Sequence, residues 1–509
     1  MDGIFLHIGD AFSSLGGLAM IIALIAGVSI GIVLGALPGF GASQSLALLF
    51  PLTFTMPADV AVLFFLAVYS AAEYGGSIPA ILIRTPGTPA QSVTVIDGHP
   101  MSEAGYPNRA LRTSLYSGVL GGVISTLVFL LIGATLASIA LNFGPGEMFA
   151  LGIFGLSIIG SFFGKDVARG FLATGIGLLL ATVGSSGFGG MRFTFGQDYL
   201  MEGIPIVVVI IAFLAGPEAL RLLIDHRRTI ETKKTVAEQK AQRRNDRFTL
   251  SDARGLIPTW IRGSLFGTGI GAIPGAGAAV ASLIAYSQEQ RWSKNRDKFG
   301  SGAIEGIAAP ECANNAVVAG TLIPSLTLGI PGSGAAAILL SVLISKGVAP
   351  GPLLFANQPV LIATIFFGLI FINFWLLLLG LIFTRGFAFV AYVPRRILGP
   401  FVMLMIMVGT YAYANYLAHV AMVLVLSLVA YWFAKLEIPA VPVVLAFVMG
   451  PIIEENMSRA MTIHSGDLMQ VLTRPIALVI FGLAIATFIY SVMTDWRNRA
   501  AADPTSAEK

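Results

Sequence analysis

The stretch GALPGFGA, Gly35 to Ala42, lies within a long apolar run, and it nearly recurs as GAIPGAGA, Gly271 to Ala278. Proline removes a backbone hydrogen-bond donor and clashes with the preceding helical turn, and glycine adds conformational freedom. Each stretch is therefore expected to interrupt a helix. The repeated interruption predicts two broken helices at corresponding positions of the chain.

The composition around these stretches is that of a membrane protein. Of 509 residues, 56% are hydrophobic and 11% are charged, and the mean hydropathy is +0.83. Soluble domains carry about 25% charged residues. Lipid offers the backbone no hydrogen-bond partner, so the recurring apolar segments are expected to be helices. The sequence predicts an all-α polytopic membrane protein, and its single cysteine, Cys312, excludes an internal disulfide.

Two further motifs return in the same order. IPAILIRTPGT, Ile78 to Thr88, matches IPSLTLGIPGS, Ile323 to Ser333, and IPIVVVIIAFLAGP, Ile204 to Pro217, matches IPAVPVVLAFVMGP, Ile438 to Pro451. Three markers in one order indicate an internal duplication. The predicted divisions are a first membrane repeat at 1–223, a basic cytoplasmic linker at 224–250, a second membrane repeat at 251–455, and a loop, extra C-terminal helix and cytoplasmic tail at 456–509.

The charges of corresponding loops predict that the repeats are inverted. PLTFTMPAD, after the first marker, has no Lys or Arg, whereas its counterpart SQEQRWSKNRDKFG has several. After the second marker the bias reverses, since NRALR is basic and GVAPGPLLFANQP is uncharged. Because positive loops stay in the cytoplasm, corresponding loops should lie on opposite sides, with the N-terminus periplasmic and the C-terminus cytoplasmic. Inverted repeats with broken helices build midplane binding sites in many secondary transporters.

The segments 75–98 and 323–346 contain too many interruptions to span a membrane, and we expect re-entrant hairpins there. A helix broken within the membrane leaves unpaired N–H groups at one end and C=O groups at the other. A Pro-Gly pair followed by a hydroxyl residue suits a carboxylate at a helix N-terminus. The alternative is that these residues only allow helices to pack closely.

Polar residues near the hairpins extend this prediction. Glu73 lies in YSAAEYGGS, and Glu311, Asn314 and Asn315 lie in AAPECANNAVVAG. Such groups are costly in lipid, so they are expected to face a cavity or to cap broken helices. Both carboxyl groups are candidate proton carriers. Arg84 could pair with an anionic substrate, but the matching position in the second half is Gly329.

Neither metal-ligand spacing among the histidines nor a catalytic motif is found in the sequence, which therefore does not indicate an enzyme. The function classes left open are a secondary carrier, an anion channel or passive carboxylate pore and, less favoured, a polytopic membrane enzyme. The basic linker is typical of a cytoplasmic loop rather than of a nucleic-acid site.

Four stretches, GALPGFGA, TPGTPAQSVTVIDGHPM, PECANNAVVAGTLIPSLTLGIPGSGAAAILL and KGVAPGPLLF, resemble the large membrane subunit, TctA, of the tripartite tricarboxylate transporters. The resemblance implies a bacterial inner-membrane carrier that imports di- or tricarboxylates with Na+ or H+ as the coupling ion, without another cofactor. It also implies a small TctB-type membrane subunit and a periplasmic TctC-type binding protein, and an elevator-like movement by analogy with similarly built carriers.

The family motifs also imply site residues. The substrate positions are Gly39, Gly41, Ser43, Thr85, Gly87, Thr88, Asn314, Asn315, Gly332, Ser333 and Gly334. The cation-coupling positions are Asn314, Gly275, Gly277, Glu73 and Glu311, and no metal is implied beyond a possible Na+. The chain departs from the family pattern at Arg84 and Pro89, which leaves the exact carboxylate open.

Overall fold

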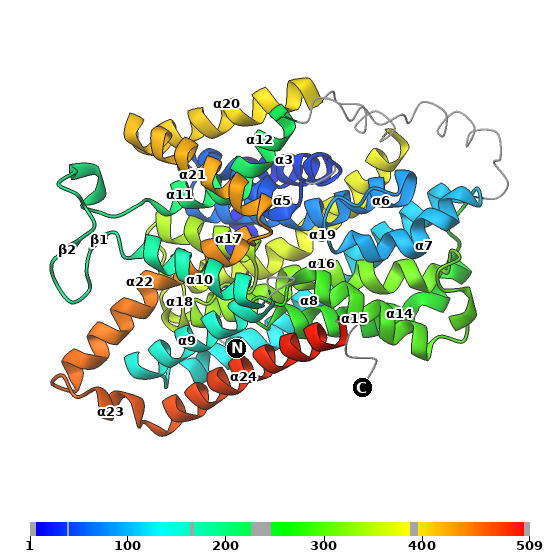
Figure 1. Cartoon of the computed structure of the whole chain (residues 1–509). Coiled ribbons are helices and arrows are strands. Elements are labelled where there is room, and N and C mark those ends of the chain that lie inside the picture. The colour runs from blue at the N-terminus through cyan, green and yellow to red at the C-terminus, as the bar shows by residue number, and fades with distance from the viewer. Residues whose placement is uncertain (1–6, 38–39, 163–166, 225–245, 387–394, 503–509) are drawn as a thin grey trace.

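The computed structural model describes residues 7–37, 40–162, 167–224, 246–386 and 395–502. Long helices dominate it (Figure 1). In this described part of the chain, eight helices are long and apolar enough to cross a membrane. The predicted all-α polytopic architecture is therefore confirmed, while most of the basic linker lies outside the described residues.

The elements of the first half follow one another in this order: α2 (Ile8–Leu15), α3 (Leu18–Gly35), α4 (Ala42–Leu49), η1 (Phe50–Thr55), α5 (Ala58–Gly75), α6 (Ser77–Ile83), α7 (Gln91–Glu103), α8 (Pro107–Ala140), α9 (Pro145–Phe162), α10 (Val167–Ala181), β1 (Gly184–Ser185), β2 (Met191–Arg192), η2 (Asp198–Leu200), α11 (Ile206–Ile210), the π-helical turn η3 (Ile211–Ala215) and α12 (Gly216–Ile224).

The second half and the C-terminal part contain α14 (Leu250–Gly271), α15 (Gly277–Trp292), η4 (Arg296–Lys298), α16 (Ile304–Leu328), α17 (Gly334–Ser345), α18 (Pro352–Asn357), α19 (Pro359–Gly386), α20 (Arg395–Ala414), α21 (Leu417–Lys435), α22 (Ala440–Ile463), α23 (Leu468–Leu472) and α24 (Pro475–Ala502).

Both predicted helix interruptions occur. α3 ends at Gly35 before α4 begins, and α14 ends at Gly271 before α15 begins. In the second interruption Gly275 and Gly277 have φ values of 83° and 67°, which belong to the left-handed region where glycine is unstrained. Pro38 and the candidate Gly39 in the first interruption lie outside the described residues.

The predicted re-entrant hairpins differ from the structure in their first arms. α6 continues the path of α5 to Ile83, and α16 is a single helix to Leu328, so these arms belong to the preceding helices. The Ile-Pro pairs do not end them, because proline is tolerated at the first turn of α6, and α16 is packed in protein around Pro324.

After α6 in the first half and after α16 in the second, the chain reverses direction in an extended segment, which we call the returning segment. It turns at Arg84 (φ 55°) in the first half and at Gly329 (φ 73°) in the second. The N–H of Gly87 donates to the carbonyl of Gly76 at 3.2 Å, and a Cβ added at Gly332 would lie 3.0 Å from Cβ of Thr321. The returning segments lead into α7 and α17, the helices that follow them.

The same backbone contacts occur in both halves. A Cβ added at Gly35 would lie 2.2 Å from the Ala72 carbonyl oxygen, so α3 touches α5 backbone to backbone. At the corresponding place in α14, a Cβ added at Gly271 would lie 3.0 Å from Cα and O of Val317 in α16. We call these two contact lines the glycine seams.

α7 of the first half and the residue after α17 of the second half each contact the segment that precedes a helix of the other half. The Asp97 carboxylate in α7 accepts hydrogen bonds of 2.8–2.9 Å from the N–H groups of Gly300, Gly302 and Ala303, just before α16. Lys346, which follows α17, donates to the carbonyl of Phe54, just before α5, at 3.0 Å. Each half therefore contacts the other just before one of the matching helices, α5 or α16.

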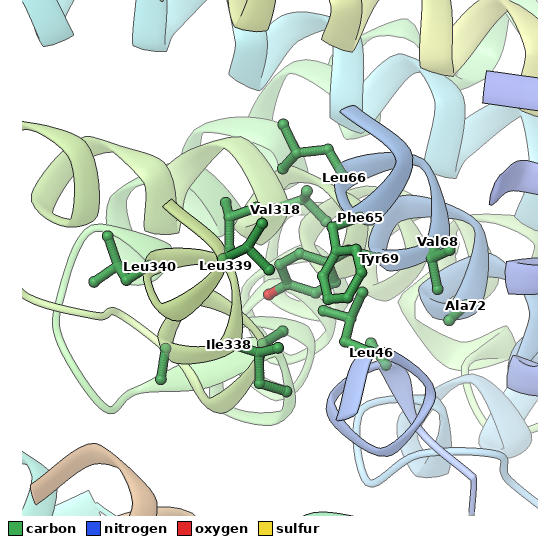
Figure 2. Close-up of a cluster of buried hydrophobic side chains, with 14 of the residues drawn as sticks. Leu46, Phe65, Leu66, Val68, Tyr69, Ala72, Val318, Ile338, Leu339 and Leu340 are labelled. Atoms are coloured by element: carbon green, nitrogen blue, oxygen red, sulfur yellow. The ribbon is translucent and has the colours of Figure 1, made fainter. Parts of the chain in front are cut away.

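The interior between the halves is apolar. Figure 2 shows Leu46 of α4, Val318 of α16 and Ile338 of α17 near the ring of Tyr69 of α5. All four side chains are buried. This core places the interrupted helices and the returning segments against one another.

Candidate functional site

The tip of the second returning segment is Ser333, a predicted substrate position. Its hydroxyl accepts a hydrogen bond from the N–H of Ala336 at 3.1 Å, so it caps the N-terminus of α17. It also shares a 3.2 Å hydrogen bond with the hydroxyl of Tyr69. A residue of the first half therefore holds the tip of the second, within the protein interior.

The corresponding tip of the first half is Thr88. Its N–H and its hydroxyl both donate to Oε1 of Gln91, the N–H at 3.0 Å. A Cβ added at Gly41 would lie 3.0 Å from the Thr88 methyl group. The first interruption and the first tip therefore touch each other.

The two tips also approach one another through α4. A Cβ added at Gly334 would lie 3.0 Å from the hydroxyl of Ser43. The structure thus brings together five of the predicted substrate positions: Gly41, Ser43, Thr88, Ser333 and Gly334.

The glycines of the Pro-Gly pairs make the backbone contacts of the site. The carbonyl of Gly332 accepts a 3.0 Å hydrogen bond from the N–H of Gly275, which ties the second interruption to its returning segment. A Cβ added at Gly87 would lie 2.5 Å from the Gly35 carbonyl oxygen. A Cβ added at Gly332 would lie 2.9 Å from the Gly271 carbonyl oxygen, so neither Gly87 nor Gly332 has room for a side chain. Gly277, by contrast, has no atom within 4 Å of an added Cβ.

A buried polar cluster lies one helical turn beyond Tyr69. The main-chain carbonyl of Glu73, at the joint between α5 and α6, accepts from Nδ2 of Asn314 at 3.3 Å and from Nε2 of Gln91. The Asn314 and Gln91 amides also lie beside the Glu73 carboxylate. The cluster therefore joins α5, α7 and α16.

Three predicted positions lie elsewhere. Asn315 faces Gly118 of α8, and its Nδ2 donates to the Glu311 carbonyl at 3.4 Å. The Glu311 carboxylate accepts from Thr94 and, at 2.8 Å, from Ser114. Thr85 is bonded to the end of α6, and neighbouring Arg84 is exposed there. The structure does not bring these residues to the two tips.

Sequence reasoning missed several polar residues of this region. Tyr69, Gln91, Thr94 and Ser114 each hydrogen-bond to a predicted residue or segment. Gln91 and Thr94 lie in the quoted stretch TPGTPAQSVTVIDGHPM, so their position in a motif was an available signal. Tyr69 is likewise the first residue of the quoted stretch YSAAEYGGS, whereas Ser114 carried no such signal, because single hydroxyl groups are common in apolar helices.

A cavity of about 800 Å³ lies at the end of α16, beside the loop that follows α17. Its walls include Leu141 after α8, Gly329 and Val348, and Ile452 and Arg459 of α22. None of the residues of the tips or the polar cluster lines it. The cavity therefore lies beside Gly329, where the second returning segment begins, rather than beside its tip at Ser333.

The sequence profile of the "Tripartite tricarboxylate transporter TctA family" matches residues 21–445. This chain belongs to that family. It is a multi-pass membrane component of a tricarboxylate transporter, and the family is one of transporters rather than of enzymes. The family assignment confirms the resemblance seen in the motifs.

Two relatives come from Agrobacterium vitis. An "uncharacterized 52.8 kDa protein in TAR-I ttuC' 3'region" is 34% identical over 474 residues, which cover 93% of each chain. An "uncharacterized protein in TAR-II ttuC' 3'region" is 35% identical over 233 residues, which cover 46% of this chain and 96% of the relative. No solved structure matches the chain.

Proposed function

We propose that this TctA-family chain is the large membrane subunit of a secondary active importer for di- or tricarboxylates in the bacterial inner membrane. It works with a small TctB-type membrane subunit and a periplasmic TctC-type binding protein, and a cation gradient drives uptake. The single observation that carries this proposal is the bond between Tyr69 and Ser333, because it joins the tip of one half to the interior of the other.

The substrate site of this proposal lies between the two tips. Ser43, Thr88 and Ser333 supply hydroxyl groups there, and α4 and α17 begin beside them. The N-terminus of a helix carries a partial positive charge and favours an anion. A carboxylate group approaching the start of α17 would exchange the Tyr69–Ser333 bond for its own hydrogen bonds.

The contacts of Asp97 and Lys346 between the two halves support inverted repeats. Asp97 in the middle of α7 meets the segment before α16, and Lys346 after α17 meets the segment before α5. Each of the two matching helices, α5 and α16, therefore begins beside the helix that follows the returning segment of the other half. This is the relation expected if α5 and α16 cross the membrane in opposite directions.

The position of the cavity supports alternating access. It opens beside the uncharged loop after α17, which the charge bias places on the periplasmic side. A substrate released by a periplasmic protein would enter there, and an elevator-like displacement of the tips relative to the flanking helices would then expose them to the cytoplasm.

The test is uptake of radiolabelled citrate and other di- and tricarboxylates into proteoliposomes that contain this chain, its small subunit and the binding protein. Accumulation above the external concentration, abolished when both the Na+ and H+ gradients are collapsed, is the expected result. Equilibration that ignores both gradients would replace the carrier by a passive pore. Chemical conversion of the substrate would indicate an enzyme.

The same uptake assay tests whether Ser333, the tip of the second returning segment, belongs to the substrate site. Ser333→Ala removes a hydroxyl group from the proposed carboxylate site at the start of α17. The loss of one substrate hydrogen bond, about 1 kcal/mol, should lower the initial uptake rate by roughly fivefold to tenfold. Ser345→Ala is the matched control, because that hydroxyl bonds only within α17, to the Val342 carbonyl. Equal rates for the two variants at equal reconstitution would remove Ser333 from the site.

A further inference from the structure

A second cavity, of about 330 Å³, lies between the first turns of α8 and the last turns of α19. The two helices touch beside it, because a Cβ added at Gly380 would lie 2.5 Å from Cδ1 of Leu115. Five residues line the cavity: Arg112, Tyr116, Leu378, Leu381 and Ile382. None of them belongs to the two tips or to the polar cluster, so this cavity is separate from the proposed substrate site.

Arg112 is the charged residue of this cavity, and it is unpaired. Within the described ranges, neither its guanidinium group nor the hydroxyl of Tyr116 has a hydrogen-bond or ion-pair partner. By contrast, Arg109, one turn earlier on α8, donates to the Asp252 carboxylate at 2.6 Å. The Tyr116 ring packs on Phe248 with the ring centroids 4.9 Å apart. The cavity therefore presents a guanidinium group and a phenol that the described protein leaves available.

The cavity lies near the boundary between hydrocarbon and headgroups. α19 begins at Pro359, and a rise of 1.5 Å per residue places Ile382 about 35 Å along it, whereas the hydrocarbon core is about 30 Å thick. α8 begins with the basic sequence PNRALR, and the charge bias predicts that this end is cytoplasmic. Basic pockets between membrane helices at this level bind anionic lipid headgroups.

One face of α19 leads from the cavity into the membrane. Phe374, Leu378 and Ile382 are four residues apart, so they share a face of the helix, and they are 56%, 42% and 59% exposed. This apolar strip suits an acyl chain, and a guanidinium group suits a phosphate, which it can bind through two parallel N–H groups. A phospholipid carries both matching parts in one molecule, and this favours a lipid over a protein helix.

We propose that the cavity binds one anionic phospholipid, whose phosphate is held by Arg112 beside the Tyr116 hydroxyl and one of whose acyl chains lies along Leu378 and Ile382. The headgroup must carry a net negative charge, because a zwitterionic headgroup already neutralises its own phosphate. The lipid bridges α8 and α19 at the surface of the protein. Its binding does not depend on the proposed transport function.

The experiment measures lipid binding on the purified full-length chain after delipidation in detergent. Native mass spectrometry counts bound lipids during addition of phosphatidylglycerol, which is anionic, or of phosphatidylcholine with the same acyl chains, which is zwitterionic. We expect one phosphatidylglycerol to bind roughly fivefold more tightly than phosphatidylcholine, and Arg112→Ala to abolish this preference. If Arg112→Ala does not fold, as judged by gel filtration, Arg112→Gln should show the same loss.

Two further variants separate the cavity from charge in general. Leu378→Trp keeps Arg112 but fills the cavity, so it should also weaken phosphatidylglycerol binding. Arg254→Ala is the matched control, because Arg254 is an exposed arginine near the start of α14 that does not line the cavity. This variant should bind phosphatidylglycerol like the wild type.

Wild-type phosphatidylglycerol affinity in Arg112→Ala would overturn the site, as would equal binding of the two lipids or an equal loss in Arg254→Ala. Competition by inorganic phosphate would replace the lipid by a free anion. Displacement of phosphatidylglycerol by the purified small membrane subunit would assign the cavity to a protein contact instead. Each outcome is separable from failure of the transport proposal, because the binding measurement contains no carboxylate substrate and no ion gradient.

Discussion

At the scale of single residues, Arg84 shows how a backbone requirement can look like a functional signal. Its charge within an apolar hairpin suggested a partner for an anionic substrate. In the structure it is exposed and occupies the left-handed C-terminal position of α6, where the second half has Gly329. The local geometry therefore accounts for the turn at this position but not for the arginine, because the left-handed conformation favours glycine.

Replacing Arg84 by glycine is expected to stabilise the protein. A side chain in the left-handed region costs about 1 kcal/mol, part of which the greater freedom of unfolded glycine offsets. The unfolding midpoint of Arg84→Gly should rise, and carboxylate uptake should persist. Ile83→Gly, within the helix, should lower the midpoint. A large loss of uptake in Arg84→Gly would return Arg84 to the substrate site.

Residue patterns predicted part of the site and could not predict the rest. Thr88 and Ser333 lie at the tips because a Pro-Gly pair and a hydroxyl together specify a turn followed by a helix. Asn314 and Asn315 carry the same chemistry, but neighbours on a helix point about 100° apart. Only the packing of α16 decides that Asn314 meets α5 while Asn315 meets α8.

At the scale of elements, the broken helices α3 and α14 were predictable, and the continuity of α16 was not. Pro324 suggested a helix end, yet α16 passes through it because both of its sides are buried in protein. The extent of tertiary packing cannot be read from one segment. For the same reason the short β1–β2 hairpin, held by bonds from Ser186 and Arg192 to Glu454, gave no sequence signal.

The glycine seams predict a sharp stability difference between neighbouring glycines. A Cβ at Gly35 would lie 2.2 Å from the Ala72 carbonyl, and one at Gly267 would lie 2.3 Å from the Ala313 carbonyl. Backbone cannot move aside easily, so Gly35→Ala and Gly267→Ala should each cost roughly 1–3 kcal/mol. The measurement is the unfolding midpoint of each purified variant.

Gly269→Ala in α14 provides the control, because no atom lies within 4 Å of the added Cβ. Alanine favours a helix over glycine by about 1 kcal/mol, so this variant should be as stable as the wild type or more stable. Equal midpoints for Gly267→Ala and Gly269→Ala would contradict the close approach of α14 and α16.

At the scale of the whole molecule, the arrangement of the halves is testable by labelling. Thr55 and Ser301 are exposed residues of corresponding loops, before α5 and before α16. Inverted halves place Thr55 in the periplasm and Ser301 in the cytoplasm. In a Cys312→Ala background, Thr55→Cys should react with a membrane-impermeant maleimide in spheroplasts, and Ser301→Cys should react only after lysis. Labelling of both from one side would exclude inversion.

The glycine seams also have a mechanical consequence. Where two backbones touch with no layer of side chains between them, there is nothing that can change rotamer to absorb sliding. We therefore expect α3 with α5, and α14 with α16, each to move as a stiff double rod. Glu73 is fixed to one rod and Asn314 to the other, so any shear between the rods changes the spacing of these two residues before it changes anything within either rod.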